Sequence, residues 1–283
     1  MKIVDLSYPW GTKELVVSHY ANGQPVLVPK TWGRNNPWRS LDRPDYRFEI
    51  TNWMYFDGTN CPDVTVWSHA GTHVETAGFH MVNPPAHLKE KGVADYSPDR
   101  YFGEAAVIDL TPLSKKYGIK IPTPTYSDYS NCVPSLHSPA KQEGKGTAAA
   151  EKNPMIFSIP LSPLKPIAKE DYATFDGKVK EGDILLIYNR IGGLSLDVNW
   201  AIDKGVKSVA VQNVWFHGER NGINNAHDVL LGNEVFIIEG IRNLDKISKD
   251  RVFFIGMPWP LLGIGASPIW AVAIEDFDRT SRR

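Results

Sequence analysis

Residues 68–80 read SHAGTHVETAGFH and hold the densest group of potential metal ligands in the chain. Three histidines and a glutamate fall within the last twelve positions of this stretch. His73 and Glu75 are two residues apart, so in an extended segment both side chains point to the same side, with Cα atoms about 6 to 7 Å apart. Gly71 tolerates the bend that would bring His69 to the same place. Spacing alone therefore predicts a metal site here.

A second pair of potential ligands, His227 and Glu239, lies far downstream. The pattern places His227 on a short helix over residues 226–231 that Asn225 can cap, followed by a strand over residues 235–238 that runs into Glu239. A tight turn joins helix and strand, so twelve residues can return the carboxylate to the imidazole. Together the two segments offer three histidines and two carboxylates, a set that can hold one or two divalent ions.

The remaining histidines have a simpler interpretation. A single histidine is more often a hydrogen-bonded core or surface residue than a ligand, and this applies to His19, His87, His137 and His217. Glu239, considered alone, also fits a solvated strand end. The ligand assignment therefore needs the two segments to come together.

Composition excludes several classes of partner. Lys and Arg number 31 and Asp and Glu 32 among 283 residues, so no net field recruits nucleic acid or an anionic membrane. The start MKIVDLSYPW does not resemble a signal peptide, and no apolar run approaches the eighteen or so residues of a membrane span. We expect a soluble, cytoplasmic protein that acts on a small molecule. The chain has two cysteines, Cys61 and Cys132, which favours nitrogen and oxygen ligands and hence zinc, manganese or iron.

Hydrophobic patterning predicts a single α/β domain over residues 1–283. We expect a short helix before a strand within residues 197–212, and strands in the segments 2–9, 63–67, 105–110, 184–188, 251–256 and 269–274. A Pro-rich insertion at about 121–166 has no apolar period and is interpreted as a lid or an oligomer contact.

Aromatic residues are dense in the first third of the chain and recur at Trp215 and Phe216. Aromatic walls with a few polar groups hold flat small molecules, so an aromatic or heterocyclic substrate is favoured. The early residues are Tyr8, Trp10, Trp32, Trp38, Tyr46, Trp53, Tyr55 and Trp67.

The stretch HAGTHVETAGFH resembles the signature HxGTHxDxPxH of the cyclase family of metal-dependent hydrolases, which includes bacterial kynurenine formamidase and isatin hydrolase. The likeness extends along most of the chain, in the order DLSYP, GEAAVIDL, EGDILLIY, AHDVLLGNEVFIIEGIRNLD, FFIGMPW and GASPIWAVAI. The resemblance implies a swivelling β/β/α fold, with a mixed sheet flanked by helices, and a homodimer or homotetramer. It also implies a zinc or manganese site of one or two ions held by His69, His73, Glu75, His227 and Glu239.

The chain departs from the signature at several positions. Glu75 stands where aspartate is usual, and its extra methylene puts the number of ions and the metal preference in doubt. Ala77 replaces the usual proline. Phe79 occupies the position expected for the catalytic histidine, and His80 follows one residue later, which a single-residue insertion near Gly78 would explain. Residues 209–222 and the Pro-rich insertion also differ from the family. These two segments lie where we expect the substrate to be selected.

The resemblance implies hydrolysis by metal-activated water, with His80 passing the proton from water to the leaving group. The expected substrate is a small cyclic or aromatic amide, formamide, imide or lactone, cleaved at a C–N or C–O bond. Two alternatives remain open: a metal-dependent cyclase or dehydratase that uses the same site, and an inactive relative that only binds a ligand.

Overall fold

The computed structural model describes residues 1–7, 15–21, 24–29, 49–56, 59–65, 68–69, 71–119 and 164–277. The chain divides into two compact units, the first formed by residues 1–8, 72–123 and 158–283 and the second by residues 9–71 and 124–157. Most of the predicted insertion at 121–166 falls outside the described residues, as do both cysteine side chains and the early aromatic side chains. The single-domain assignment and the role of the insertion stay predictions.

The described part of the second unit contains two antiparallel hairpins. Strand β2 (Leu15–Ala21) pairs with β3 (Gln24–Pro29), and β4 (Glu49–Phe56) pairs with β5 (Thr59–Thr65). The predicted strand at 63–67 begins inside β5, and its last two residues lie outside the described part.

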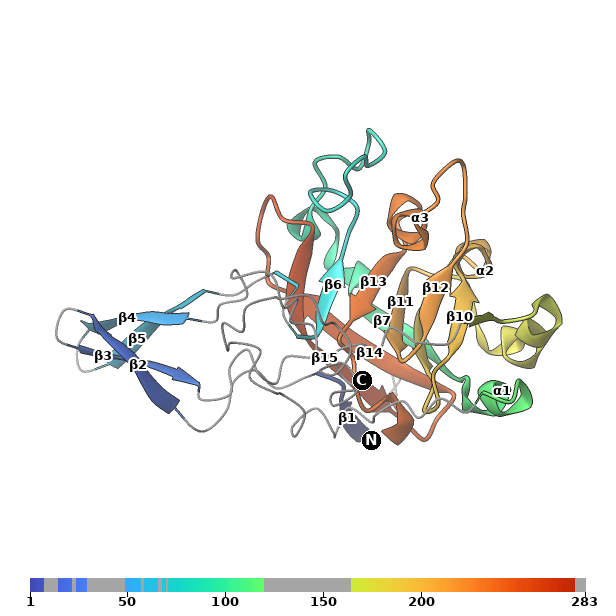
Figure 1. The fold of residues 1–283 in the computed structure, drawn as a ribbon, viewed down its shortest axis with the longest axis horizontal. Helices are drawn as coiled ribbons and strands as arrows, with labels where there is room; N and C mark the ends of the chain where they lie inside the picture. Colours follow the sequence, from blue (N-terminus) through green and yellow to red (C-terminus); the bar gives the residue numbers. More distant parts are fainter. Residues whose placement is uncertain are drawn as a thin grey trace, which may run out of the picture. The chain divides into compact units, whose positions relative to one another are not determined.

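The first unit is built on an eight-stranded mixed sheet in the order β1-β15-β14-β7-β9-β11-β13-β6 (Figure 1). The short strand β6 pairs with β13 on one side and with β15 on the other, which closes seven of the strands into a barrel. Strands β7, β9, β11 and β13 run parallel, and the other pairings are antiparallel. The strands are β1 (Lys2–Asp5), β6 (His73–Glu75), β7 (Phe102–Asp109), β9 (Ile184–Tyr188), β11 (Ser208–Gln212), β13 (Phe236–Glu239), β14 (Arg251–Pro258) and β15 (Ala266–Glu275).

Short helices and a small parallel sheet accompany the barrel. The α-helices are α1 (Thr111–Lys116), α2 (Val198–Asp203) and α3 (Ala226–Gly232), and the small sheet has the order β12 (Trp215–His217), β10 (Leu194–Asp197) and β8 (Lys165–Pro166). Single turns of 3₁₀-helix are η1 (Val93–Asp95), η2 (Pro98–Arg100), η5 (Asp176–Lys178) and η6 (Leu244–Lys246), and η4 (Lys169–Thr174) is longer. The predicted mixed sheet flanked by helices is confirmed. Among the described residues, no helix is long and apolar enough to cross a bilayer.

Alternation along the strands separates the two hydrophobic cores. In β9, Ile184 and Leu186 belong to one core, and Leu185 and Ile187 belong to the other. The core that contains Leu185 and Ile187 also contains the apolar residues of α2 and α3, so it lies on the outer face of the barrel. The other core therefore fills the interior. Because side chains alternate across a strand, each outward position of the barrel is predictable from its register.

The same alternation determines where β6 presents its side chains. Val74 is 1% exposed and belongs to the interior core, so His73 and Glu75 on either side of it face outward. Helix α3 packs on this outer face against β13, the strand beside β6 in the sheet (Figure 1). The fold thus brings the two predicted ligand segments to one face.

Candidate metal centre

Strand β6 holds His73 and Glu75 in a fixed place, because hydroxyl groups anchor both of its ends. The Thr72 hydroxyl donates to the carbonyl of Gly240 at 2.6 Å, and the Thr76 hydroxyl donates to the carbonyl of Gly265 at 3.0 Å. Both threonines are fully buried. Neither threonine is among the residues predicted from the sequence, although their position on either side of the ligand pair in GTHVET is a signal for this role.

The register between β6 and β13 places Glu239 directly opposite His73. Glu239 has the same parity on β13 as Ile237, which packs in the outer core, so its carboxylate faces outward with the two ligands of β6. The distance from His73 Nε2 to Glu239 Oε2 is 3.9 Å, and that from His73 Nε2 to Glu75 Oε1 is 3.1 Å. Two strands from distant parts of the chain thus contribute an imidazole and two carboxylates.

Helix α3 brings His227 over this group. The side chain of Asn225 accepts a hydrogen bond from the backbone N–H of His227, so the predicted cap at the start of the helix is confirmed. His227 Nε2 lies 2.7 Å from Glu75 Oε2 and 3.6 Å from Glu239 Oε1. The helix, turn and strand fold back as expected, and the imidazole meets both carboxylates.

His80 reaches the same group from the turn that follows β6. Its Nε2 lies 3.8 Å from Glu75 Oε2, and its ring centroid lies 5.5 Å from that of His227. The side chain of His80 is 20% exposed, whereas the preceding residue, Phe79, is 53% exposed. Of the two residues around the expected position, His80 is therefore the one that faces the carboxylate.

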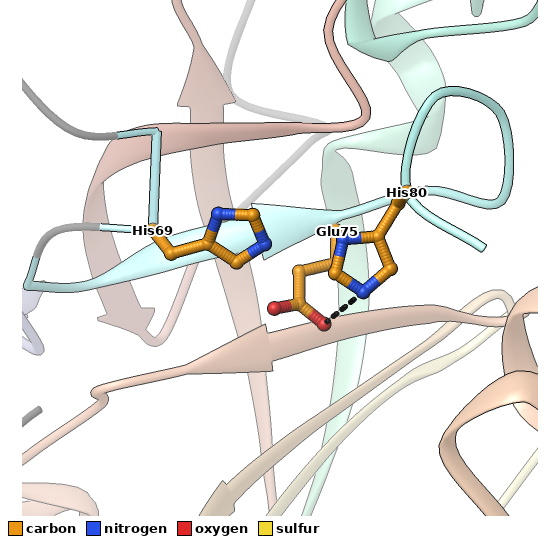
Figure 2. Close-up of side chains that lie close together, drawn as sticks. All are labelled: His69, Glu75 and His80. Carbon is orange, nitrogen blue, oxygen red and sulfur yellow. Dashed lines mark ion pairs between the residues drawn. The ribbon is translucent and has the colours of Figure 1, made fainter. Parts of the chain in front are cut away.

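His69 belongs to the second unit, so its part in the metal site stays a prediction. Figure 2 labels this residue with Glu75 and His80 and marks the ion pair between the His80 imidazole and the Glu75 carboxylate. The His69 Nδ1 also lies 3.0 Å from the Ser68 hydroxyl. The bend expected at Gly71 is present, since this glycine has a left-handed φ of 60°. Within the first unit, His73, Glu75 and Glu239 form a group in which each side chain offers a ligand atom within 4.8 Å of the others.

The buried carboxylate of Glu75 is ionised in this arrangement. Burial opposes its ionisation, but hydrogen bonds from His227 and His73 outweigh that effect and hold the pKa of Glu75 well below its usual value. Burial likewise lowers the pKa of His227, but Glu239 and Glu75 together raise the pKa of His227 to about 10. Burial lowers the pKa of His80, and Glu75 opposes that shift only in part. The site therefore concentrates negative charge that attracts a cation.

The donor set fits a divalent transition metal. Imidazole nitrogens and carboxylate oxygens are the ligands that zinc and manganese accept, and two carboxylates balance the charge of one such ion. A buried carboxylate normally needs a paired cation or a metal, and His227 Nε2 lies 2.7 Å from the carboxylate of Glu75. The roles of the individual ligands remain predictions.

The other predicted assignments have a mixed outcome. His87 is exposed and His217 is half-buried, and neither belongs to the ligand groups found among the described residues. The side chains of His19 and His137 lie outside the described part.

Comparisons with solved structures identify the fold. The isatin hydrolase A of Ralstonia solanacearum matches with a TM-score of 0.55 and 13% identity, over 97% of this chain and 92% of that one. An isatin hydrolase bound to the product analogue thioisatinate matches with a TM-score of 0.54 and 15% identity, over 96% and 91%. A predicted metal-dependent hydrolase from Bacillus stearothermophilus matches with a TM-score of 0.50 and 16% identity, over 96% and 97%.

The sequence itself matches no protein-family model and no curated protein. These three structures are each less than one-fifth identical to this chain, so they establish the architecture and leave the reaction to the site. The chain therefore has the fold of the isatin hydrolases, which is the fold that the order of its sequence motifs predicts.

Proposed function

We propose that this protein is a metal-dependent hydrolase that cleaves a C–N or C–O bond in a small cyclic or aromatic amide, formamide, imide or lactone. The observation that carries this proposal is the convergence of His73, Glu75, His80, His227 and Glu239 on one outer face of the barrel. The fold shared with the isatin hydrolases supports the same class of reaction.

Five side chains would hold the metal: His69, His73, Glu75, His227 and Glu239. A bound divalent ion acidifies water and polarises a carbonyl group. We assign zinc or manganese because the donors are imidazoles and carboxylates. Glu75 has its Oε1 near His73 and its Oε2 near His227, and this arrangement is compatible with one ion or with two.

His80 is the residue that we assign to proton transfer. Its imidazole lies beside the carboxylate of Glu75 and remains partly open to solvent, so it can contact both the site and an incoming molecule. Because burial lowers the pKa of His80, the ring is neutral near pH 7 and accepts a proton. In the proposed reaction His80 takes a proton from water and returns it to the leaving nitrogen or oxygen.

The test is a turnover assay on protein purified without chelators. Metal content is measured first, and the protein is then offered cyclic amides, cyclic imides, lactones and N-formyl aromatic amines while proton release is recorded. Opening a lactone, a cyclic imide or a cyclic anilide to a carboxylate releases a proton, because the alcohol, amide or aniline that is freed stays neutral near pH 7, so hydrolysis of these substrates acidifies a weakly buffered solution. We expect turnover that a chelator abolishes and that zinc or manganese restores.

The His80→Ala variant tests the assigned proton carrier. We expect kcat to fall by about 10² to 10⁴, the usual contribution of general acid–base catalysis, while the metal content stays unchanged. His87→Ala is the matched control, since His87 is exposed and lies outside the ligand groups. Near-normal turnover by metal-loaded His80→Ala would remove the role assigned to this residue.

The two alternative functions give different results in the same experiment. A cyclase or dehydratase would form a product that has lost water, without the release of acid. A ligand-binding relative would lack turnover on every substrate class, and a protein that cannot be loaded with metal would contradict the proposal altogether.

A further inference from the structure

The turn between β6 and His80 has an unusual residue at its third position. The turn spans Ala77 to His80, with the His80 N–H 3.4 Å and the Met81 N–H 3.0 Å from the Ala77 carbonyl oxygen. Phe79 has a left-handed φ of 59°, while Gly78 before it does not have a left-handed φ. A positive φ in a turn is normally adopted by glycine or asparagine. The glycine in this turn is one position too early to supply that conformation.

The backbone on both sides of Phe79 has no room to move. A Cβ on Gly78 would lie 2.3 Å from the Lys91 carbonyl oxygen, and a Cβ on Gly265 would lie 2.4 Å from the Gly78 carbonyl oxygen. The Cβ of Gly265 would also lie 2.6 Å from that of His80. The backbone is therefore tightly packed before and after Phe79. The direction of the chain at His80 then depends on the torsion angles of Phe79.

The conformation of Phe79 is strained, and burial of its ring does not offset the strain. A bulky L-residue with positive φ is a steric outlier, and such strain tends to persist where function requires it. Phe79 is 53% exposed, so it gains little from packing. His80, the next residue, faces Glu75 at 3.8 Å. An extended backbone at Phe79 would turn the chain the other way and carry the imidazole away from the carboxylate.

We propose that Phe79 is a positioning residue whose left-handed backbone turns the imidazole of His80 toward Glu75. This inference rests on the proposed function, because it gives the turn a role in proton transfer by His80. It also accounts for the displaced histidine in this chain: the left-handed residue compensates for the one-residue shift relative to the HxGTHxDxPxH signature.

Three substitutions at one position test the proposal. Phe79→Gly and Phe79→Asn accept a left-handed backbone, whereas Phe79→Val does not, since a β-branched residue is poorly tolerated at positive φ. We expect kcat of the Gly and Asn variants to stay within about twofold of the wild type, since both still place the proton carrier. For the Val variant we expect kcat to fall by about tenfold or more, with metal content and KM unchanged.

A matched control separates positioning from general loss of stability. Asp276 also has a left-handed φ, of 55°, and directly follows the last residue of β15. The other end of this strand, at Ala266, is the end that pairs with Glu75. Asp276→Val should lower the thermal stability without changing kcat. If Phe79→Val does not fold, Phe79→Gly still decides the matter, because a tenfold loss of kcat in that variant would overturn the proposal.

Crystal structures of the variants make the inference independent of the proposed reaction. We expect the contact between His80 Nε2 and Glu75 Oε2 to be kept in Phe79→Gly and lost in Phe79→Val. If the wild type hydrolyses none of the substrates but this contact responds as expected, the proposed function fails and the positioning role stands. If Phe79→Val keeps the contact, Phe79 does not position His80.

Discussion

Replacing Glu75 by glutamine is the sharpest single perturbation of the candidate metal centre. The change keeps the size of the side chain and removes its negative charge. Glu75 is 2% exposed, and it lies 2.7 Å from His227 Nε2 and 3.1 Å from His73 Nε2. Glutamine leaves the protonated imidazole of His227 with a single carboxylate partner, Glu239, at 3.6 Å. The metal-free and metal-bound proteins should both respond, for different reasons.

The cost in the metal-free protein follows from the loss of a buried ion pair. Breaking such a pair costs about 3 to 5 kcal/mol, and because His227 is one-quarter exposed we expect about 2 to 3 kcal/mol here. The low pKa of Glu75 makes its contribution present above about pH 4.5 and lost on acidification. The pKa of His227, raised to about 10, makes the contribution complete below about pH 6.5 and lost as the pH rises to 10. The difference between wild type and variant should peak near pH 5 to 6.

The metal-bound protein loses a ligand as well. Zinc at about 100 times its Kd stabilises the wild type by about 2.7 kcal/mol through mass action. Loss of the Glu75 carboxylate, a direct ligand, should weaken zinc binding at least as much as loss of a residue that only hydrogen-bonds to a ligand. Loss of such a residue lowers the metal affinity about 10- to 100-fold. A 100-fold weaker Kd at the same zinc concentration leaves about 0.4 kcal/mol of stabilisation.

Thermal unfolding with a chelator and with added zinc measures both effects. We expect the Glu75→Gln variant to unfold roughly 4 to 12 °C below the wild type without metal. Added zinc should raise the Tm of the wild type and leave that of the variant nearly unchanged. Glu170→Gln, at an exposed glutamate, is the control and should follow the wild type. An equal rise of Tm with zinc in wild type and Glu75→Gln would refute the assignment of Glu75 as a ligand.

Three further predictions address the scaffold. Asn225→Ala removes the cap of α3 and should cost about 1 kcal/mol, with weaker metal binding because His227 is the second residue of that helix; calorimetric zinc titration measures the latter. Phe254→Ala empties a fully buried position of the interior core and should cost about 3 to 5 kcal/mol in denaturant unfolding, without altering metal stoichiometry in the folded protein. Hydrogen bonds from Ser248 and an ion pair with Lys2 hold the pKa of Glu275 at about 2 despite its burial. Glu275→Gln should therefore cost about 1 to 2 kcal/mol near pH 7, and this difference should vanish between pH 4.5 and 2 in unfolding measured across pH.

Much of the local structure could be predicted from the sequence, because it depends on near neighbours. The strand at 184–188 and the helix that Asn225 caps agree with the pattern of apolar residues and caps. The strand expected at 235–238 is observed one residue later, as Phe236–Glu239, which makes Glu239 its last residue. Strand ends depend on pairing with neighbouring strands, and β13 is hydrogen-bonded to β6, whose position the sequence does not reveal.

The pairing of segments that are distant in the sequence was harder to predict. The spacing of His73 and Glu75 predicts a common side, and the burial of Val74 between them agrees with it. No periodicity shows that these three residues form a strand between β13 and β15, because a segment this short has no pattern of its own. The sequence predicts that His80 takes the role expected at position 79. It does not predict the left-handed φ of Phe79, which we propose orients His80.

The closure of the barrel by β6 links metal binding to local opening of the protein. Residues 73–75 pair with two neighbouring strands, and the side chains of His73 and Glu75 belong to the candidate metal site. A bound ion stabilises the closed arrangement, in which β6 is paired with β13 and β15. The free energy needed to separate β6 from these two strands should therefore rise with metal occupancy. Hydrogen–deuterium exchange of the amides in residues 73–75 should therefore slow on metal loading. The amides of β9, which pairs with β7 and β11 and not with β6, should exchange at an unchanged rate.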